Sequence, residues 1–529
     1  MMKALVLLTL CIIFYGTCKM QAQDGAPDPD FGDGDGLVHH SFFTDQPSIG
    51  YAIAVQEDQK ILVSGYTKGP DEKEFAFISR YEEAGDLDIS FNGNGFIIPD
   101  IPADYSFSKG VKIQPDGKIV MCVESSDSTG RKAWVFRYLT NGIPDHTFGD
   151  EGRVVISIGS KFIGVKALAL QPDGKIVVGG YAGGDLRDSF FIIRLQVNGV
   201  LDNSFDGDGI VKTEVGESYT NISTLVLQPD GKIVAAGSAY FNGNEDFALV
   251  RYNTNGSLDQ SFSDDGIQHI TFSDGEDRIQ SALIQPDNKI VTGGLAVNNV
   301  TGKWDFAAAR FNPDGTLDPV FHGDGKTLIY ITPYSDASYS MIRQPDGKIV
   351  LGGYVHSDAQ AGGADLTLVR LNPDGTQDMT FDEDGIYTPP VKLGIETVIY
   401  KSALQPDGKI VSTGFYNENG LNQVMLFRTL TGLTTATQEV NEVITDIALY
   451  PNPVSENFVL KYSLENNEDI QVSICDASGR TVDQLLGLAE RRAGYHEEHL
   501  KLNKWLMAGC YFVKMETSAG VKALRVMKE

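Results

Sequence analysis

Cysteine is scarce in this chain of 529 residues, which has five. Cys11 and Cys18 lie in a short leader-like stretch, so Cys122, Cys475 and Cys510 remain, and no CxxC pair occurs among them. This spacing excludes a disulfide framework and a CxxC zinc site. Cys475 and Cys510 either form one disulfide, which an exported protein permits, or stay as two separate thiols.

Basic residues are also few, with 43 Lys and Arg against 71 Asp and Glu and a net charge of −28. Nucleic acids and anionic membrane surfaces are bound by clustered Lys and Arg, so this balance excludes both as partners. The acidic surplus indicates a soluble surface, with divalent-cation binding as the alternative.

Long apolar runs are absent apart from the amino terminus. After Lys3, the run from Ala4 to Phe14 is far shorter than the ~20 residues that span a bilayer. Small and polar residues follow it, which predicts a secretory signal peptide over 1–22, cut near Ala22. The stretch FYGTC lacks the small aliphatic pattern of a lipoprotein, so lipidation of Cys18 is not favoured. No segment of the mature chain is predicted to cross a membrane.

The motifs of common enzymes are missing as well. The chain has no HExxH and no GxSxG, no phosphate-binding glycine loop opens a helix, and its eight histidines are scattered. We therefore predict that the chain is not an enzyme. A carboxylate pair that cleaves a polysaccharide is defined by a distance in space of ~5–9 Å, so such an enzyme is kept as the alternative.

What the sequence has in abundance is one repeat. A hairpin like QPDGK recurs seven times, as QEDQK in the first copy and QPDNK in the fifth, at spacings of 58, 57, 57, 57, 59 and 61 residues. Its first residue is Gln56, Gln114, Gln171, Gln228, Gln285, Gln344 and Gln405. A phenylalanine in a turn like LDxxFxxDG recurs in step, as Phe31, Phe91, Phe148, Phe205, Phe262, Phe321 and Phe381. An arginine that ends an alternating strand is the third marker, as Arg80, Arg137, Arg194, Arg251, Arg310, Arg370 and Arg428.

Each repeat contains four short runs rich in β-branched and aromatic residues, bounded by Gly, Pro, Asp and Asn. Four strands in seven units predict an all-β chain with a seven-bladed β-propeller over 23–431. A linear β-solenoid is the alternative. The first unit begins with a strand that no hairpin precedes, GLVHHSFF, and the last unit ends at Arg428, so we expect the amino-terminal strand to complete the last blade.

The repeats resemble the delta-60 repeat family of secreted bacterial propellers, which has no established activity. The resemblance rests on LDNSFDGDG, LQPDGKIVAAG and FALVRYNTNGSLD within 201–259 and extends over about 28–430. It implies a fold and no catalytic residues.

The two faces of the predicted propeller differ. In an antiparallel meander the QPDGK turns and the LDxxF turns share one face, and they are nearly uniform; the loops of the other face vary, which is where function usually lies. Aromatic residues flank these varied loops, and we predict a ligand-binding platform of Tyr66, Tyr181, Tyr240, Tyr354, Phe415 and Trp304. Packing between blades is the alternative role for these side chains.

The repeated arginines and the aspartates of LDxxF are expected to be scaffold, since Arg suits carboxylates and turn carbonyls. Asp-rich turns resemble fragments of calcium loops without the spacing of an EF-hand. We predict no metal and no cofactor, with calcium as the alternative, held by Asp33, Asp35, Asp206 and Asp208.

The character of the chain changes after the last repeat. A Thr-rich linker is predicted over 432–446 and a small C-terminal β-sandwich over 447–529. This segment resembles the type A sorting domain of the type IX secretion system of Bacteroidetes, through YPNP, DASGR, AGCYFVKM and KALRVMKE in that order. The matching motif residues are Tyr450, Pro451, Asn452, Pro453, Gly479, Gly509 and Tyr511.

The resemblance implies that the type IX machinery exports the chain, which is then secreted or held on the outer cell surface. The predicted function is a secreted or surface propeller that binds glycan or protein. The alternatives are an enzyme acting on polysaccharide in the central funnel and a structural surface component without a small ligand.

Overall fold

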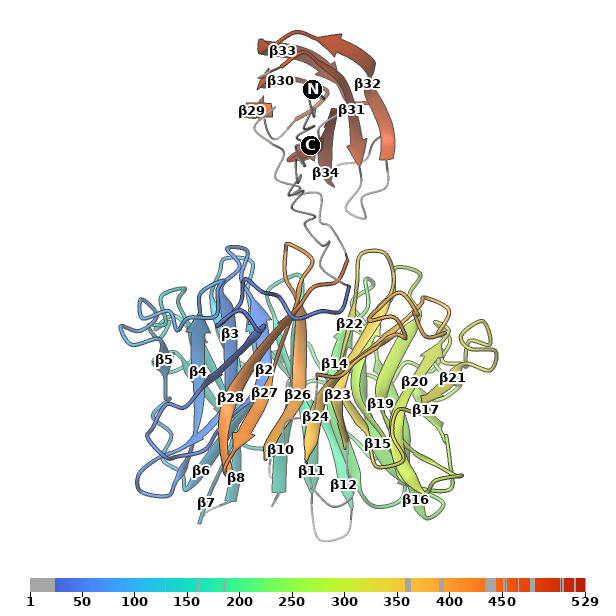
Figure 1. Ribbon diagram of the computed structural model, residues 1–529. Helices are drawn as coiled ribbons and strands as arrows, with labels where there is room; N and C mark the ends of the chain where they lie inside the picture. Colours follow the sequence, from blue (N-terminus) through green and yellow to red (C-terminus); the bar gives the residue numbers. More distant parts are fainter. Residues whose placement is uncertain are drawn as a thin grey trace, which may run out of the picture.

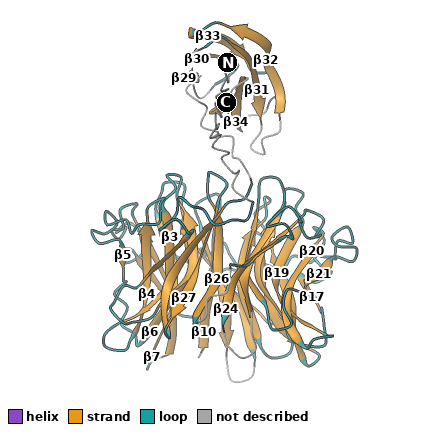
Figure 2. Cartoon of the chain, in the orientation of Figure 1, coloured by secondary structure: helices purple, strands orange, loops and turns teal. Residues whose placement is uncertain are grey.

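The computed structural model describes residues 24–128, 130–158, 162–183, 187–356, 363–389, 394–432, 444–450, 452, 454–464, 466–475, 481–504, 506, 509–517 and 520–528. Every regular element in these ranges is a strand (Figure 2), which confirms the all-β class. The predicted signal peptide (1–22), most of the predicted linker and the motif residues Pro451, Pro453 and Gly479 lie outside the described residues.

Each repeat folds into a four-stranded antiparallel sheet whose spatial order follows the sequence. The first two sheets comprise β2 (Ser48–Val55), β3 (Ile61–Lys68), β4 (Glu74–Tyr81), β5 (Phe96–Ile97), β6 (Tyr105–Ile113), β7 (Ile119–Asp127), β8 (Gly130–Tyr138) and β9 (Arg153–Ile156). A single parallel bridge between Glu74 and Tyr105 joins them. The third and fourth sheets comprise β10 (Phe162–Leu170), β11 (Ile176–Gly183), β12 (Asp188–Leu195), β13 (Ile210–Thr213), β14 (Thr220–Leu227), β15 (Ile233–Phe241), β16 (Asn244–Tyr252) and β17 (Ile267–Ile270).

The remaining sheets follow the same plan. The fifth and sixth comprise β18 (Asp277–Ile284), β19 (Ile290–Asn298), β20 (Lys303–Phe311), β21 (Lys326–Ile329), β22 (Ala337–Arg343), β23 (Ile349–His356), β24 (Ala364–Leu371) and β25 (Ile386–Tyr387). The last comprises β26 (Ile395–Leu404), β27 (Ile410–Glu418), β28 (Leu421–Thr429) and β1 (Leu37–His40). Within the described ranges we therefore count seven four-stranded units, which stand side by side in Figure 1 as the blades of a β-propeller.

The ring is closed by the amino-terminal strand, as expected from the sequence. β1 pairs with β28 in antiparallel register, from Leu37 opposite Phe427 to His40 opposite Val424. The last blade thus combines strands from the two ends of the propeller, and its outer edge is covered.

One node of side chains is repeated in every blade, and the third blade shows it clearly. Arg194 Nε donates to Asp202 Oδ2 at 2.7 Å, and the Lys175 ammonium lies 3.5 Å from the same oxygen. The guanidinium lies 4.5 Å from the centroid of the buried Phe205 ring. Its Nη1 then donates to the carbonyl oxygen of Thr254 in the next blade, at 2.5 Å. One arginine therefore joins two turns of its own blade and the turn of its neighbour.

The same geometry recurs around the ring. The Arg–Asp pairs are Arg80–Asp88, Arg137–Asp145, Arg194–Asp202, Arg251–Asp259, Arg310–Asp318, Arg370–Asp378 and Arg428–Asp28. At the closure, Arg428 takes Asp28 from the amino terminus and donates to the carbonyl of Glu83 in the first blade. These contacts confirm the scaffold role of the arginines and place the QPDGK and LDxxF turns on one face.

The C-terminal segment forms two sheets around a separate core. Its strands are β29 (Ile444–Tyr450), β30 (Asn457–Leu464), β31 (Glu468–Cys475), β32 (Thr481–Arg491), β33 (Gly494–Lys501), β34 (Gly509–Thr517) and β35 (Gly520–Lys528). The sheet orders are β29-β30-β33 and β32-β31-β34-β35, and Leu460, Val472 and Met515 are buried between them. β29 begins inside the stretch predicted as linker. Cys475 is a free, buried thiol.

Hydrogen bonds and charges at the nodes set the titration of the aspartates. Against the cost of burial, Ser204 and the Arg194 and Lys175 charges lower the pKa of Asp202 to about 2, from an ordinary 3.8. Asp145 and Asp378 behave alike, each with a pKa of about 2. Two buried carboxylates act in the opposite sense, because burial raises the pKa of Asp277 and of Asp336 to about 6.

We predict an acid transition that originates at the nodes. A carboxylate whose pKa is lower in the folded chain stabilises it above the unfolded pKa, and this contribution disappears as the pH falls from about 4 towards about 2. The pKa of Asp277 and of Asp336 is higher in the folded chain, so their contribution to stability is lost as the pH rises from about 4 through about 6, and stability falls over this interval. In thermal melts as a function of pH, Asp202→Asn should be less stable at neutral pH and less sensitive to acid. Parallel profiles for the variant and the wild type would contradict this.

We also predict that removing residues 24–45 lowers the melting temperature sharply. The deletion removes β1 and leaves Arg428 without its carboxylate partner Asp28, and breaking a buried ion pair alone costs about 3–5 kcal/mol. Calorimetric melts check the prediction, with Asp28→Asn to separate the ion pair from the strand. An unchanged melt after the deletion would show that β1 does not close the ring.

Candidate functional site

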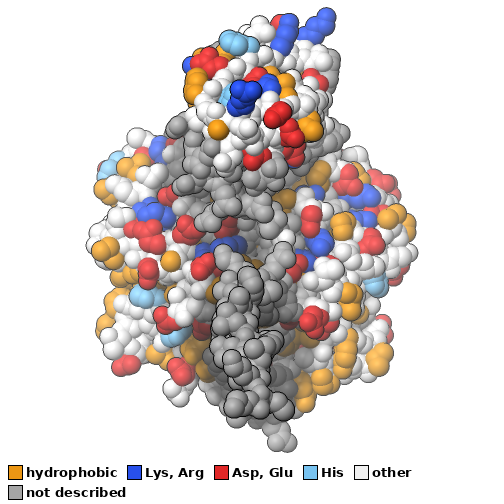
Figure 3. All heavy atoms as spheres, turned by 45° about the horizontal axis from the view of Figure 1, so that its top comes forward, with side chains coloured by type: hydrophobic (Ala, Val, Ile, Leu, Met, Phe, Trp, Pro, Cys, Tyr) orange, Lys and Arg blue, Asp and Glu red, His pale blue; other side chains and the backbone are white. Residues whose placement is uncertain are grey.

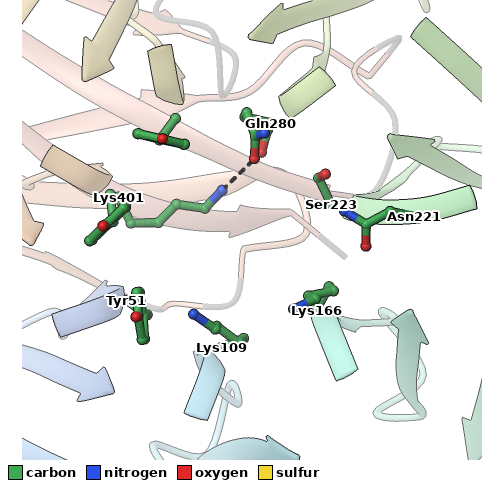
Figure 4. Close-up of a pocket in the computed structure, with 9 residues that line it drawn as sticks. Tyr51, Lys109, Lys166, Asn221, Ser223, Gln280 and Lys401 are labelled. Atoms are coloured by element: carbon green, nitrogen blue, oxygen red, sulfur yellow. Dashed lines mark hydrogen bonds between the residues drawn. The ribbon is translucent and has the colours of Figure 1, made fainter. Parts of the chain in front are cut away.

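A β-bulge interrupts the inner strand of every blade at the same place. In each of β2, β6, β10, β14, β18, β22 and β26, one extra residue opposes the second strand. A bulge redirects the side chain of its extra residue. The seven bulged residues are Tyr51, Lys109, Lys166, Ser223, Gln280, Tyr339 and Tyr400, and together with Asn221 and Lys401 they line one pocket of about 210 Å³ in the central channel (Figure 4).

Tyrosines occupy one side of this central pocket. The ring centroids of Tyr51 and Tyr400 lie 5.1 Å apart, and those of Tyr339 and Tyr400 lie 5.2 Å apart. Burial raises the pKa of all three phenols, that of Tyr400 to about 12, so each stays a neutral hydrogen-bond donor. Their rings present flat apolar faces and their hydroxyls can bind polar groups.

Three lysines also line the pocket, Lys109 and Lys166 from β6 and β10 and Lys401 from β26 beside Tyr400. The Lys109 ammonium lies 2.8 Å from the centroid of the Tyr51 ring, and Lys166 enters from the adjacent blade. Lys401 reaches across the pocket and donates to the backbone carbonyl of Gln280 at 3.5 Å (Figure 4). None of the described lining residues is acidic, so the charges of these lysines are not neutralised within the pocket wall.

Burial in the channel, together with neighbouring positive charges, lowers the pKa of two lysines. Burial and the charge of Lys166 lower the pKa of Lys109 well below its ordinary value, although the nearby Glu124 carboxylate opposes this. Burial and the charge of Lys112, which lies on the same strand as Lys109, lower the pKa of Lys401 to about 8. An anion placed among these amines would restore their protonated forms, so the pocket is arranged to accept negative charge.

Four of the six aromatic residues predicted from the sequence stand directly behind this ring. Tyr66 stacks on Tyr51 with centroids 5.9 Å apart. Tyr354 lies 6.0 Å from Tyr339, Phe415 lies 6.1 Å from Tyr400, and the Lys166 ammonium lies 5.6 Å from the Tyr181 ring. These four occupy the same position on the second strand of their blades, and each supports a bulged residue.

The other two predicted residues lie elsewhere. Trp304, on β20, has its ring 5.9 Å from the Arg278 guanidinium, and Tyr240 lies at the outer end of β15 beside Gly216. Neither lines the central pocket.

The Asp-rich turns, which are the alternative calcium sites predicted from the sequence, form hydrogen bonds within the turns themselves. Asp35 Oδ1 accepts the backbone N–H of Leu37, and Asp208 Oδ1 accepts that of Ile210 at 2.8 Å, which is the geometry of Asx turns. Asp33 and Asp206 lie on exposed turns. Among the residues that the structure describes, no group of three or more acidic, His or Cys side chains is placed to hold a metal.

Sequence reasoning missed the bulged ring, although a signal was present. The bulged residue always lies five positions before the Gln of the QPDGK hairpin, and it is Tyr, Lys, Lys, Ser, Gln, Tyr and Tyr in the successive repeats. This variation falls inside a strand rather than in a loop. A search limited to variable loops therefore passes over it.

Two family models match the chain, and they define its class. The model described as a domain of unknown function (DUF5122) beta-propeller matches 171–205, 228–262, 285–321 and 344–381. The model of the secretion system C-terminal sorting domain matches 448–529. Both resemblances seen in the sequence are thereby confirmed: the chain joins repeats of this propeller type to a type IX sorting domain. It is exported by the type IX system, to the cell surface or outside.

Comparison with curated proteins finds no match. Among solved structures, the polysaccharide lyase Uly1 is 11% identical, with a TM-score of 0.40 over 79% of this chain and 94% of that one. An ulvan lyase of family PL25 is 12% identical, with a TM-score of 0.29 over 86% and 98% of the two chains. The propeller domain of the trilobed protease from Pyrococcus furiosus is 9% identical, with a TM-score of 0.33 over 74% and 96%. These likenesses concern the fold alone.

The solved structures correct one prediction. We predicted from the missing motifs that the chain is not an enzyme, but propellers of this general form are found in polysaccharide lyases and in a protease. Catalytic side chains are brought together in space and not in sequence, so the missing motifs do not exclude an enzyme. In the described part of the chain, no helix is long and apolar enough to cross a membrane.

We predict that Lys401 titrates near pH 8 and that Lys112→Met raises its pKa towards the ordinary 10.5, because a neighbouring positive charge is removed. Nuclear magnetic resonance of isotopically dimethylated lysines measures both values. Lys303→Met, an exposed lysine on β20, is the control and should leave Lys401 unchanged. A Lys401 pKa of 10.5 in the wild type would refute this account of the pocket.

Proposed function

We propose that the propeller binds an acidic glycan, and that its central pocket holds a negatively charged sugar residue. The observation that carries the proposal is the bulged ring, which places lysines and tyrosines around one pocket with no acidic side chain among its described lining residues. Export to the cell surface or outside gives such a protein access to extracellular polysaccharide.

Each side of the pocket suits one part of such a ligand. Lys109, Lys166 and Lys401 can pair with a carboxylate or sulfate, and charge-assisted bonds are about twice as strong as neutral ones. The faces of Tyr51 and Tyr400 can pack on the apolar face of a sugar ring. Ser223, Gln280 and Asn221 offer hydrogen bonds to hydroxyl groups.

Size and charge limit how much of the glycan enters. A volume of about 210 Å³ is below the ~300–1,000 Å³ of sites for drug-sized ligands, so the pocket fits a single residue or a chain end. The protein carries a net charge of −28, and acidic and basic side chains are interspersed over the face shown in Figure 3. A polyanion is repelled by this net charge, whereas the channel concentrates positive potential at one point. A charged chain end therefore suits the site better than a wrapped polymer.

A second candidate function is cleavage of the same ligand by β-elimination. The pKa of Lys401, which is lowered to about 8, favours it, because above that pH the neutral amine can act as a base while Lys109 and Lys166 pair with the uronate carboxylate. The amine would take the proton beside the uronate carboxylate, the bond to the leaving oxygen would break as a double bond forms, and a Tyr400 phenol would protonate that oxygen. A rise in the ultraviolet absorbance of unsaturated uronate during incubation would establish cleavage, and its absence with binding intact would leave recognition alone.

We predict that acidic oligosaccharides bind and that neutral oligosaccharides of the same length bind at least about ten-fold more weakly, since each charged contact is worth about 1.5–3 kcal/mol. Calorimetric titration measures both affinities. Lys109→Met and Lys166→Met should each weaken the acidic ligand about ten-fold, whereas Lys303→Met on the exposed start of β20 should not.

The binding should also depend on pH and salt. Lys401 loses its proton as the pH rises through about 8, so affinity falls there, and added salt weakens it further. Equal affinity for acidic and neutral oligosaccharides, or binding unchanged in both lysine variants, would contradict the proposed function.

A further inference from the structure

A second cavity lies at the side of the ring, in the seam between the sixth blade and the last. Its volume is about 490 Å³, which falls in the ~300–1,000 Å³ range of small-molecule sites. Apolar walls come from four strands: Leu366 on β24, Tyr387 on β25, Phe427 on β28 and Leu37 on β1. The Tyr387 and Phe427 rings stack with centroids 5.7 Å apart. We refer to this cavity as the seam groove.

The groove exists because the outer strand of the sixth blade is short. β25 pairs only with Leu368 and Val369 of β24. In the fifth blade, β21 pairs with four residues of β20, and Ile329 covers Phe306, the counterpart of Leu366. The inner part of β24 therefore faces the seam, where the Leu366 N–H donates to Thr397 Oγ1 of the last blade at 2.9 Å.

Asp365, which has one unpaired carboxylate oxygen, is among the lining residues of this groove. It is 5% exposed, and its Oδ2 is buried with no hydrogen-bond partner among the described residues. Asp246 and Asp305, the equivalent residues of the fourth and fifth blades, also have one buried oxygen each, Oδ1, without a partner among the described residues, while Asp305 Oδ2 accepts a hydrogen bond from the Asn298 side-chain amide at 2.7 Å. A buried carboxylate oxygen without a partner is costly, and of these three aspartates Asp365 is the one that lines the groove.

The charged lining residues of the groove are acidic. Asp35 is a second acidic lining residue, and none of the described lining residues is basic. Burial, with the nearby Asp382 and Asp35 carboxylates, raises the pKa of Tyr387. The environment therefore favours a positive charge and disfavours a negative one, the reverse of the central pocket.

We propose that the seam groove binds a small organic cation, consisting of an apolar body of about one aromatic ring and a primary ammonium group that pairs with Asp365. The apolar body packs against Leu366, Tyr387 and Phe427, and the ammonium pairs with the Asp365 carboxylate. This site is separate from the central pocket and shares no lining residue with it.

Calorimetric titration of the mature full-length chain with phenethylammonium tests the proposal, with phenylethanol as the neutral ligand of the same shape. We expect the ammonium to bind about ten-fold more tightly or better, which is the strength of one charge-assisted hydrogen bond. Asp365→Asn should remove this difference, whereas Asp305→Asn, the matched change one blade away, should preserve it. Lys109→Met in the central pocket should also preserve it.

A second variant tests the site without changing Asp365, so the proposal stays testable if Asp365→Asn does not fold. Ile395→Trp fills the groove from its rim on β26 without touching the carboxylate, and it should abolish binding of both probes while the melting temperature stays close to that of the wild type. Equal affinity of the wild type for the two probes would overturn the proposal. So would ammonium binding that survives Asp365→Asn, or no ammonium binding at the highest soluble concentration.

Discussion

The propeller depends on one guanidinium in each blade. Arg194 and its six counterparts each bind an aspartate of their own blade, cover a buried phenylalanine ring and donate to a carbonyl of the next blade. At the last link, Arg428 donates both to the Asp28 carboxylate and to the Glu83 carbonyl, so the ring closes through residues that are 400 and 345 positions away in sequence. Apolar packing between blades is not directional, whereas this bond fixes the position of one blade against the next.

Fixing the blades at one face leaves the channel free to vary. The inner strands are held at their QPDGK ends, and a bulge above that end turns one side chain of each strand towards the axis. This residue lines the central pocket and does not pack in the core, and its identity differs between blades. Local variation also opens the seam groove, where β25 is shortened. An acidic molecule thus carries a pocket lined by lysines on its axis and an acidic, apolar groove at its side, and we propose that the two bind ligands of opposite charge.

Much of the fold can be predicted from the sequence, because its markers act locally. Pro, Asp and Gly set the QPDGK turns, and the spacing of Arg, Asp and Phe reflects contacts within one repeat. The pairing of β1 with β28 follows from counting strands. The chemistry of the channel cannot be predicted in this way, because a bulge breaks the alternation by which strand faces are assigned. The sequence therefore predicts Tyr66 and Tyr354 as site residues. It does not predict Tyr51 and Tyr339, on which they stack, or the bulged Lys109. Asp365 and Asp305 occupy equivalent positions, but Asp365 lines the groove and Asp305 bonds to Asn298, a difference that no local pattern encodes.

The central claim is that the bulged ring, and not the varied loops, carries the ligand chemistry of the propeller. A crystal structure of the mature chain soaked with a short uronate or sulfated oligosaccharide tests it most directly. The account predicts sugar density in the central pocket, with its acidic group among Lys109, Lys166 and Lys401 and a ring face on Tyr51 or Tyr400. Sugar density at the outer loops beside Tyr240 or Trp304, with the central pocket holding only water, would contradict it.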